Sequence, residues 1–237
     1  MKGDLGKALS DFEKAIVMDP EGIDAYKKRG EAYRRNGLLD KARENYDQVI
    51  KNILTKMKSS SGTRATNFLK PDPFYGPDLL FAYMDRADIY LSKKEYDKAI
   101  QDFNQAISLY PNSPLAYLGR AELFRDLGKK RQDKMQINQA IRDYDRAIEL
   151  DPKEAMAYLN RGVAYDNLGD YRQAIRDFDR AIELDPKDVK AYSNRGISYM
   201  QLGDHQQAIG DFKIAARLGH KGAQDYLRSK GISWEPF

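Results

Sequence analysis

The stretch AMAYLNRGVAYDNLGDYRQAIRDFDRAIELDPKD, residues 155–188, decides the fold of this chain. In its first half, Tyr158, Gly162 and Tyr165 recur at the spacing of one helix face, and the small Gly162 predicts a close approach by another helix. A second helical stripe follows at Ala174, Ile175, Phe178, Ala181 and Ile182. A Gly-Asp turn separates the halves, and an Asp-Pro pair ends the second. The unit is therefore an antiparallel helix hairpin, which must stack on neighbours to bury its apolar stripes.

Such neighbours occur at a fixed interval. Residues 191–212, AYSNRGISYMQLGDHQQAIGDF, repeat the unit, so that Tyr192, Gly196 and Phe212 each fall 34 residues after their counterparts. A helix-turn-helix period of this length resembles the tetratricopeptide repeat family. The resemblance implies an all-α solenoid, a right-handed superhelix of antiparallel helix hairpins. In this family the concave groove is lined by the first helix of each hairpin and commonly binds a partner peptide or protein.

The repeat pattern divides the whole chain. It predicts a half repeat with the second helix only (1–22), a repeat with an extended second helix (23–58), a loop insertion (59–79), a repeat (80–113), a repeat with a seven-residue insertion (114–154), two further repeats (155–188 and 189–222), and an end helix with a tail (223–237). Because seven residues make about two helical turns, we expect the insertion to lengthen the second helix of its repeat at its start without rotating the apolar face.

The start of the chain lies in mid-repeat, so it is either a fragment of a longer protein or a helix without its hairpin partner. One side of Leu5, Leu9, Phe12 and Ile16 is then left without a partner in the repeat pattern. We expect a second copy to cover this side in a homodimer joined through the N-terminal half repeat. The aromatic loop around Phe74 is the alternative cover.

Composition excludes several classes of protein. The 237 residues contain no cysteine, which excludes disulfides and thiolate metal sites, and no apolar run of about 18 residues that would predict a transmembrane segment. His205 and His220 have no second ligand at metal-binding spacing, and no carboxylate pair is set out as an acid and a base. We therefore expect a protein that is not an enzyme and needs no cofactor. Its cellular location is left open.

Positive charge is concentrated in the two insertions. Residues 56–70 carry four basic and no acidic side chains, and residues 129–135 carry four basic and one acidic. A nucleic-acid-binding solenoid would spread this charge along its groove, so no nucleic acid partner is expected. A solvated surface is the simpler interpretation, and recruitment to an acidic partner or a membrane surface is the alternative.

An arginine recurs on each first helix next to the small residue. The set is Arg29, Arg86, Arg120, Arg161 and Arg195, and aspartates recur on the second helices at Asp102, Asp143 and Asp177. A ladder of ligand-binding arginines is one interpretation. We favour structural pairing, because arginine can bury its stem while its guanidinium reaches a carboxylate.

The groove-lining residues follow from helical geometry. The face of each first helix that lies roughly 130° from its core stripe is not uniformly polar. The candidate binding residues on it are Met84, Leu118, Arg125, Met156, Leu159, Asn160, Val163, Asn194, Ile197 and Met200. Methionine adapts to a ligand, and the asparagines, one repeat apart, can bind the amides of a peptide backbone. We expect Leu159 and Met200 to lie on the surface.

Some members of the family bind a C-terminal carboxylate with lysine, asparagine and arginine on consecutive first helices. Lys190 and the asparagines match that resemblance, whereas Leu118, Leu159 and Val163 stand where further polar groups would be needed. The sequence thus predicts a non-catalytic scaffold that binds a protein or peptide in its concave groove. A self-assembling oligomeric scaffold is the alternative.

Overall fold

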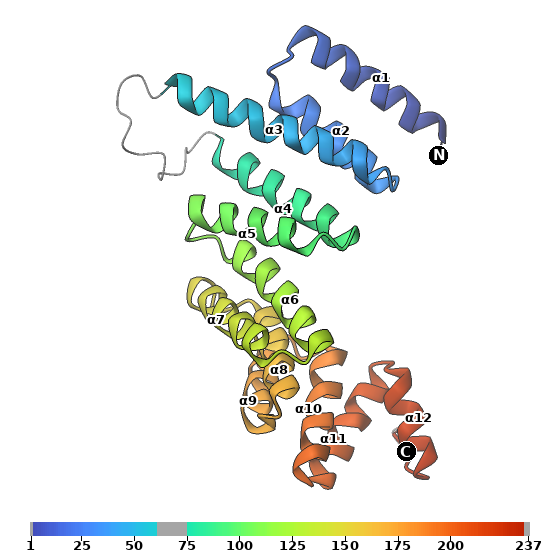
Figure 1. The fold of residues 1–237 in the computed structure, drawn as a ribbon. Helices are drawn as coiled ribbons and strands as arrows, with labels where there is room; N and C mark the ends of the chain where they lie inside the picture. The colour runs from blue at the N-terminus through green and yellow to red at the C-terminus, as the bar shows by residue number, and fades with distance from the viewer. Residues whose placement is uncertain (1, 61–74, 235–237) are drawn as a thin grey trace. The chain divides into compact units, whose positions relative to one another are not determined.

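The computed structural model describes residues 2–60 and 75–234, which form twelve α-helices and no strand (Figure 1). They belong to two compact units, residues 1–116 and 117–237. The first unit contains α1 (Lys2–Met18), α2 (Ile23–Arg35), α3 (Leu39–Ser60), α4 (Gly76–Ser92) and α5 (Tyr96–Leu109). The second contains α6 (Pro114–Arg131, whose first turn lies in the first unit), α7 (Lys134–Leu150), α8 (Ala155–Leu168), α9 (Tyr171–Leu184), α10 (Val189–Leu202), α11 (His205–Arg217) and α12 (Lys221–Ser229).

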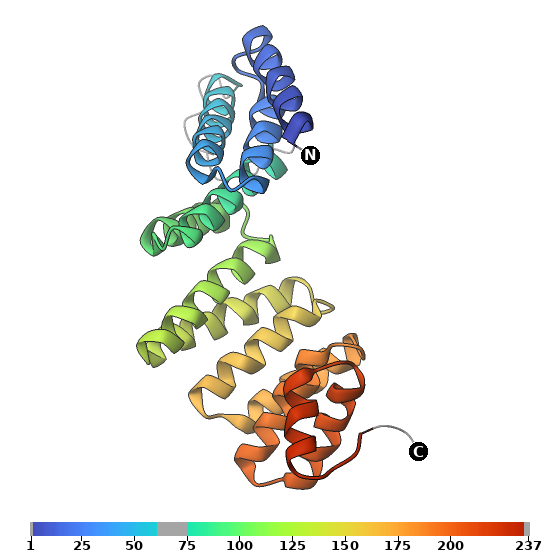
Figure 2. The same cartoon turned by 90° about the vertical axis from the view of Figure 1, so that its right-hand side faces the viewer.

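Antiparallel hairpins make up both units, as Figure 2 shows from a second direction. In the first unit α2 packs on α3 and α4 on α5, and in the second α8 packs on α9 and α10 on α11. Helix α1 packs against α2, and α12 covers α11. The tetratricopeptide-type helical solenoid predicted from the repeats is therefore present in each unit.

The predicted turn residues end and start the helices. Gly169 follows α8 with a φ of 83°, a left-handed conformation that glycine adopts without steric strain. The side chain of Asp170 then accepts a hydrogen bond from the backbone N–H of Gln173 at 3.1 Å, which caps the N-terminus of α9. The turn of the hairpin is thus fixed by two adjacent residues.

Close approach within each hairpin depends on the small residue of the first helix. A Cβ atom added to Gly162 would lie 2.6 Å from Cε1 of Phe178, and one added to Gly196 would lie 2.8 Å from Cε1 of Phe212. The ring of Phe178 is fully buried beneath α8. The close contact predicted from Gly162 is confirmed.

The recurring arginines pair with carboxylates. Arg161 donates from Nε and Nη2 to both carboxylate oxygens of Asp177 on α9, at 2.8 and 2.7 Å, and from Nη1 to Asp145 on α7 at 2.7 Å. The same three-helix arrangement joins Arg86 to Asp102 and Asp47, and Arg195 to Asp211 and Asp179, while Arg120 donates to Asp143 and Arg29 to Asn45. Hydrogen bonding to Asp211 raises the pKa of Arg195, so the guanidinium stays charged. These contacts confirm structural pairing.

The seven-residue insertion is shared between two helices. Helix α6 has 18 residues and α7 has 17, against 14 in each of α8 and α9. The prediction that only the start of the second helix grows is therefore incomplete, because α6 also continues beyond the usual end. The two helices are in close contact on either side of the insertion, since a Cβ on Gly128 would lie 2.5 Å from Cγ1 of Ile137.

The first unit departs from the predicted boundaries around the loop at 59–79. Helix α3 continues to Ser60, and α4 begins at Gly76 rather than at residue 80. Pro77 suits this first helical turn, because its ring fixes a helical φ and its missing N–H would have no partner there. Residues 61–74, which include Phe74, lie outside the described ranges.

We predict that Gly162→Leu lowers the free energy of unfolding by roughly 1–3 kcal/mol or more, because the new side chain must displace the Phe178 ring. Gly210→Ala is the matched control: it lies inside α11, and an added Cβ meets nothing within 4 Å. The control should stabilise the protein by up to about 1 kcal/mol. Urea denaturation measures the free energy of unfolding of both variants. If the two substitutions change it equally, the Phe178 ring does not require a glycine at position 162.

Deletion of residues 129–135 should leave a soluble protein that unfolds cooperatively. All seven residues are exposed or half-buried, and their removal restores the two helices to the length of the neighbouring hairpin. The deletion removes the capping residue Asp133, which accepts from the N–H of Met135 at 2.9 Å. Adding Gln136→Asp to the deletion variant should therefore recover about 1 kcal/mol in a thermal unfolding measurement. An aggregated product would show that the extra turns are needed for the core.

Candidate functional site

The first helices of the second unit border an open hollow of about 240 Å³. It is lined by Arg125, Asp126 and Lys129 of α6, by Met156, Leu159, Asn160, Val163 and Asn167 of α8, and by Lys190 and Asn194 of α10. Six of these positions were among the predicted binding residues: Arg125, Met156, Leu159, Asn160, Val163 and Asn194. Residues from three successive first helices therefore meet at one place.

Asn160 occupies the centre of a hydrogen-bond network. Its Oδ1 accepts from Nη1 of Arg125 at 2.7 Å, and its Nδ2 donates to Oε1 of Glu122 at 2.9 Å. Arg125 also donates to Oδ1 of Asp126, from Nε at 3.0 Å and from Nη2 at 2.9 Å. Asn160 was predicted to bind a peptide backbone, and its amide, which has two N–H donors and two acceptor positions, makes one hydrogen bond at each end here. These two bonds link α8 to α6.

Two further residues lie near this network: Glu122, an exposed residue of α6 that takes part in it, and Tyr144, whose buried hydroxyl has no hydrogen-bond partner among the described residues. Desolvation raises the pKa of the Glu122 carboxyl, against the lowering effect of the nearby Arg125 charge. Burial likewise raises the pKa of Tyr144, whose side chain on α7 is fully buried, so the phenol stays protonated. The α6 side of the hollow is thus a preformed polar wall.

Leu159 lies in the hydrophobic core and not on the surface. Only 2% of it is exposed, and it packs in a cluster with Phe178 of α9 and Ala191 of α10. The expectation of an exposed Leu159 is therefore wrong. The next hairpin covers it, because α10 stacks against both α8 and α9.

The exposed apolar part of the face comes from α8 and α10. Met156 is 46% exposed and Ile197 is 43% exposed, and Val163 is half-buried. Ile197 lies one turn after Asn194 on α10, so it extends the same face beyond the hollow. Met156 and Ile197 thus offer apolar contact area next to the polar groups of the hollow.

Three predicted residues lie away from the hollow. Met84 is in the first unit and packs against its core, and Leu118 packs half-buried against the cluster around Tyr144. Met200 faces the C-terminal end, where its sulfur lies 3.4 Å from Nδ1 of His205 and 3.8 Å from the hydroxyl of Tyr226. The expectation that Met200 lines the groove with Met156 is not met by this geometry.

Sequence reasoning missed Asp126, Lys129 and Asn167, which lie further along the same helix faces. A signal for Asn167 was present, because it follows Asn160 by two helical turns. Among the described residues, its Nδ2 is buried without a hydrogen-bond partner, and no carboxylate lies within 4.0 Å of the Lys129 or Lys190 ammonium group. The hollow therefore combines unpaired donors with an apolar border.

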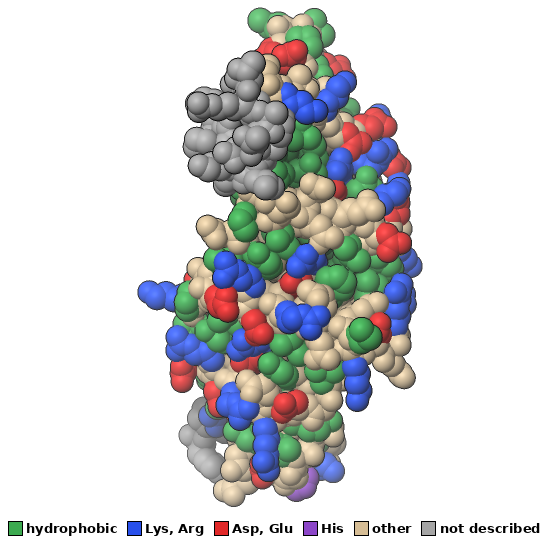
Figure 3. All heavy atoms as spheres, turned by 60° about the vertical axis from the view of Figure 1, so that its left-hand side comes forward, with side chains coloured by type: hydrophobic (Ala, Val, Ile, Leu, Met, Phe, Trp, Pro, Cys, Tyr) green, Lys and Arg blue, Asp and Glu red, His purple; other side chains and the backbone are tan. Residues whose placement is uncertain are grey.

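Other kinds of site find no support in the part of the chain that the structure describes. It contains no group of three or more histidine, cysteine or acidic residues placed to bind a metal, and none of its helices is long and apolar enough to cross a membrane. Figure 3 shows hydrophobic, basic and acidic side chains intermixed on the face it presents.

Comparison with known protein families identifies the helix hairpins. Models described as tetratricopeptide repeat match residues 2–53, 81–113, 155–188 and 178–210, and one described as TPR repeat matches residues 133–169. The chain belongs to the tetratricopeptide repeat (TPR) family. A search of curated proteins finds no significant match.

Solved structures agree on the TPR fold. A MamA protein is 20% identical with a TM-score of 0.61, and the match covers 90% of this chain and 98% of that one. MamA from Desulfovibrio magneticus RS-1 is 17% identical with a TM-score of 0.64, over 83% of this chain and 94% of that one. YrrB is described as a TPR protein with an unusual peptide-binding site. It is 22% identical with a TM-score of 0.58, and the match covers 93% of this chain and 98% of that one.

Two glutamate substitutions on α8 test the corrected face. Leu159→Glu should lower the free energy of unfolding by several kcal/mol, because it places an unpaired charge in the core. Met156→Glu, three residues earlier, should change it by less than about 0.5 kcal/mol, because that side chain is already exposed. Circular dichroism during chemical denaturation gives both values. If the Leu159→Glu variant is as stable as the wild type, Leu159 is not part of the core.

Proposed function

We propose that this TPR chain is a non-catalytic interaction scaffold that binds a peptide segment of a partner protein against α8 and α10. The observation that carries the proposal is the hollow lined by the exposed Met156 and by Lys129, Lys190 and Asn167 as unpaired donors, with the exposed Ile197 next to it on α10. An apolar border with a few convergent polar groups is the usual form of a specific binding site.

The chemistry of the lining suggests what the peptide brings. An apolar side chain of the ligand would bury the exposed parts of Met156 and Ile197. A carboxylate would pair with Lys190 or Lys129, which face no acidic neighbour within 4.0 Å among the described residues. Asn160 is oriented by its hydrogen bonds with Arg125 and Glu122, and because an amide has two N–H donors it can also donate to a ligand in the hollow that it lines.

The likeness to YrrB is consistent with this proposal, since YrrB is described as binding peptide and shares the fold. The seven-residue insertion also contributes to the site, because Lys129 lies in the extra turns of α6. In this proposal the positive charge of the insertion, through Lys129, attracts acidic groups of the ligand.

Selection from a random peptide library tests the proposal. Peptides that bind the wild-type chain should lose at least about tenfold in affinity when Met156→Glu and Ile197→Glu are combined, because the apolar contact is lost. Leu38→Glu is the matched control, since Leu38 is 42% exposed but lies in the first unit. Fluorescence anisotropy gives the dissociation constants.

The lysines allow a second measurement on the same peptides. Lys190→Ala should weaken the binding of peptides that contain an acidic residue and reduce their salt dependence. Peptides that bind all variants equally would place the binding surface elsewhere on the chain.

A further inference from the structure

The turn between α6 and α7 is fixed by hydrogen bonds to both helices. Gln132 has a left-handed φ of 54°, and the N–H of Asp133 donates to the carbonyl of Gly128 at 2.8 Å, which closes the C-terminus of α6. The carboxylate of Asp133 accepts from the backbone N–H groups of Met135 and Gln136, at 2.9 and 3.3 Å, and so caps α7. The side chains of this turn are therefore presented on a defined backbone.

Three cations of this turn have no acidic partner. Lys130 and Arg131 end α6, Lys134 begins α7, and all three are exposed. Among the described residues no carboxylate lies within 4.0 Å of any of them. The C-terminus of a helix favours the first two, but the N-terminus of a helix disfavours a cation, so Lys134 does not stabilise α7 by its position. With Asp133 as the one acidic residue, positive charge is in excess here.

An exposed methionine lies among these cations. Met135 directly follows Lys134 in the first turn of α7, and 81% of it is exposed. It therefore contributes little to the hydrophobic core. A long apolar side chain next to basic ones is typical of a segment that lies in the headgroup region of a membrane.

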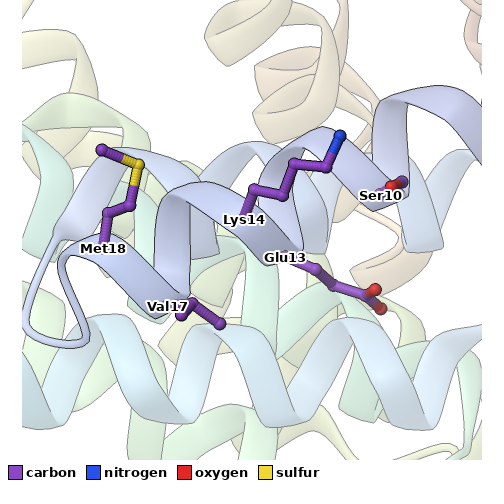
Figure 4. A pocket seen from close by; sticks show the side chains of 5 residues that line it. All are labelled: Ser10, Glu13, Lys14, Val17 and Met18. Carbon is purple, nitrogen blue, oxygen red and sulfur yellow. The ribbon is translucent and has the colours of Figure 1, made fainter.

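Exposed apolar side chains alone do not indicate a partner. Val17 and Met18 of α1 are 80% and 86% exposed and border a shallow hollow (Figure 4). Glu13 and Lys14 line the same hollow, and the Lys14 ammonium lies 3.6 Å from the carboxylate of Asp11. Charges of both signs therefore surround that apolar pair, whereas the turn between α6 and α7 has an excess of one sign.

We propose that residues 130–135, the basic tip, bind the surface of a membrane that contains anionic phospholipids. Lys130, Arg131 and Lys134 lie at the headgroups in this arrangement, where each basic residue increases partitioning about fivefold. Met135 enters the boundary between the headgroups and the acyl chains. The contact stays at the surface, because none of the described helices is long and apolar enough to cross a membrane.

The composition of the basic tip favours lipid over other anionic partners. No aromatic side chain occurs between residues 128 and 137, so the bases of a nucleic acid would have nothing on which to stack. Two of the three cations are lysines, whose compact charge on a flexible stem suits mobile headgroups better than a bidentate contact with one carboxylate. A purely ionic contact with an acidic protein would leave Met135 in water.

Co-sedimentation with vesicles tests the proposal. The full chain is mixed at low ionic strength with vesicles of phosphatidylcholine alone, or of equal parts of phosphatidylcholine and phosphatidylserine. It should bind only the anionic vesicles and be released as salt is added. Combining Lys130→Ala, Arg131→Ala and Lys134→Ala should lower partitioning about 100-fold. Met135→Gln, which leaves the charge unchanged, should lower it at least about threefold.

The matched control changes three exposed lysines elsewhere in the second unit, as Lys153→Ala, Lys187→Ala and Lys221→Ala combined. This variant has the same net charge as the triple variant of the basic tip, and it should lose less than about tenfold in partitioning. Equal losses for the two triple variants overturn the proposal, as does a wild type that binds no vesicles or binds neutral ones equally well.

A general site for polyanions is the remaining alternative. Polyglutamate or an oligonucleotide that binds as tightly as the anionic vesicles, together with no effect of Met135→Gln on vesicle binding, would also overturn the proposal. None of these results bears on peptide binding at α8 and α10, because Lys129 and the other residues that line the hollow are unchanged in every variant.

Discussion

An arginine held between carboxylates of two other helices is the interaction on which the hairpin stack depends. Arg161 makes two hydrogen bonds within its own hairpin and one to the hairpin before it. A buried ion pair contributes little net stability, because desolvation offsets much of the attraction. Its directional bonds, however, allow one register between the helices and leave any other register with an unpaired charge. Apolar packing drives the helices together, and the arginine selects how they meet.

The glycine beside this arginine is part of the same constraint. Because Gly162 has no side chain, the Phe178 ring lies directly against the α8 backbone. This separation brings the guanidinium of Arg161 within bidentate reach of Asp177, one residue before the ring. The Arg-Gly pair of a first helix and the Asp-Phe pair of its second helix are therefore matched sets.

Much of this was predictable from the sequence because it depends on contacts that recur with the repeat. The period places Gly162 against Phe178 and Arg161 against Asp177 whatever the neighbouring repeats contain. Leu159 and Asn160 could not be assigned in this way. Leu159 is buried by the next hairpin, and Asn160 is held by Arg125, which is 35 residues earlier and is not matched by an arginine in the later repeats. A helical wheel shows the direction of a side chain but not which neighbour covers it.

The insertion between α6 and α7 is a second case in which the repeat pattern predicts only part of the structure. Its length of two turns predicts that the apolar faces stay in phase, and the packing of Gly128 on Ile137 agrees with that. The division of the added residues between the two helices depends on where the turn forms. Asp133, which caps α7, and Gln132, with a φ of 54°, set that position. Both lie within the insertion, so the repeat pattern carries no information about them.

The uneven count of hydrogen bonds at Arg86, Arg161 and Arg195 has a mechanical consequence. Within a hairpin two bonds resist separation, whereas between hairpins the guanidinium contributes one, as for Arg195 with Asp211 and Asp179. We therefore expect the joints between hairpins to be more flexible than the hairpins themselves. Small rotations at successive joints add up along a repeat array and change the curvature of its binding face. One such scaffold can then adjust to ligands of different thickness through small shifts in the apolar contacts between hairpins, such as that of Leu159 with Ala191.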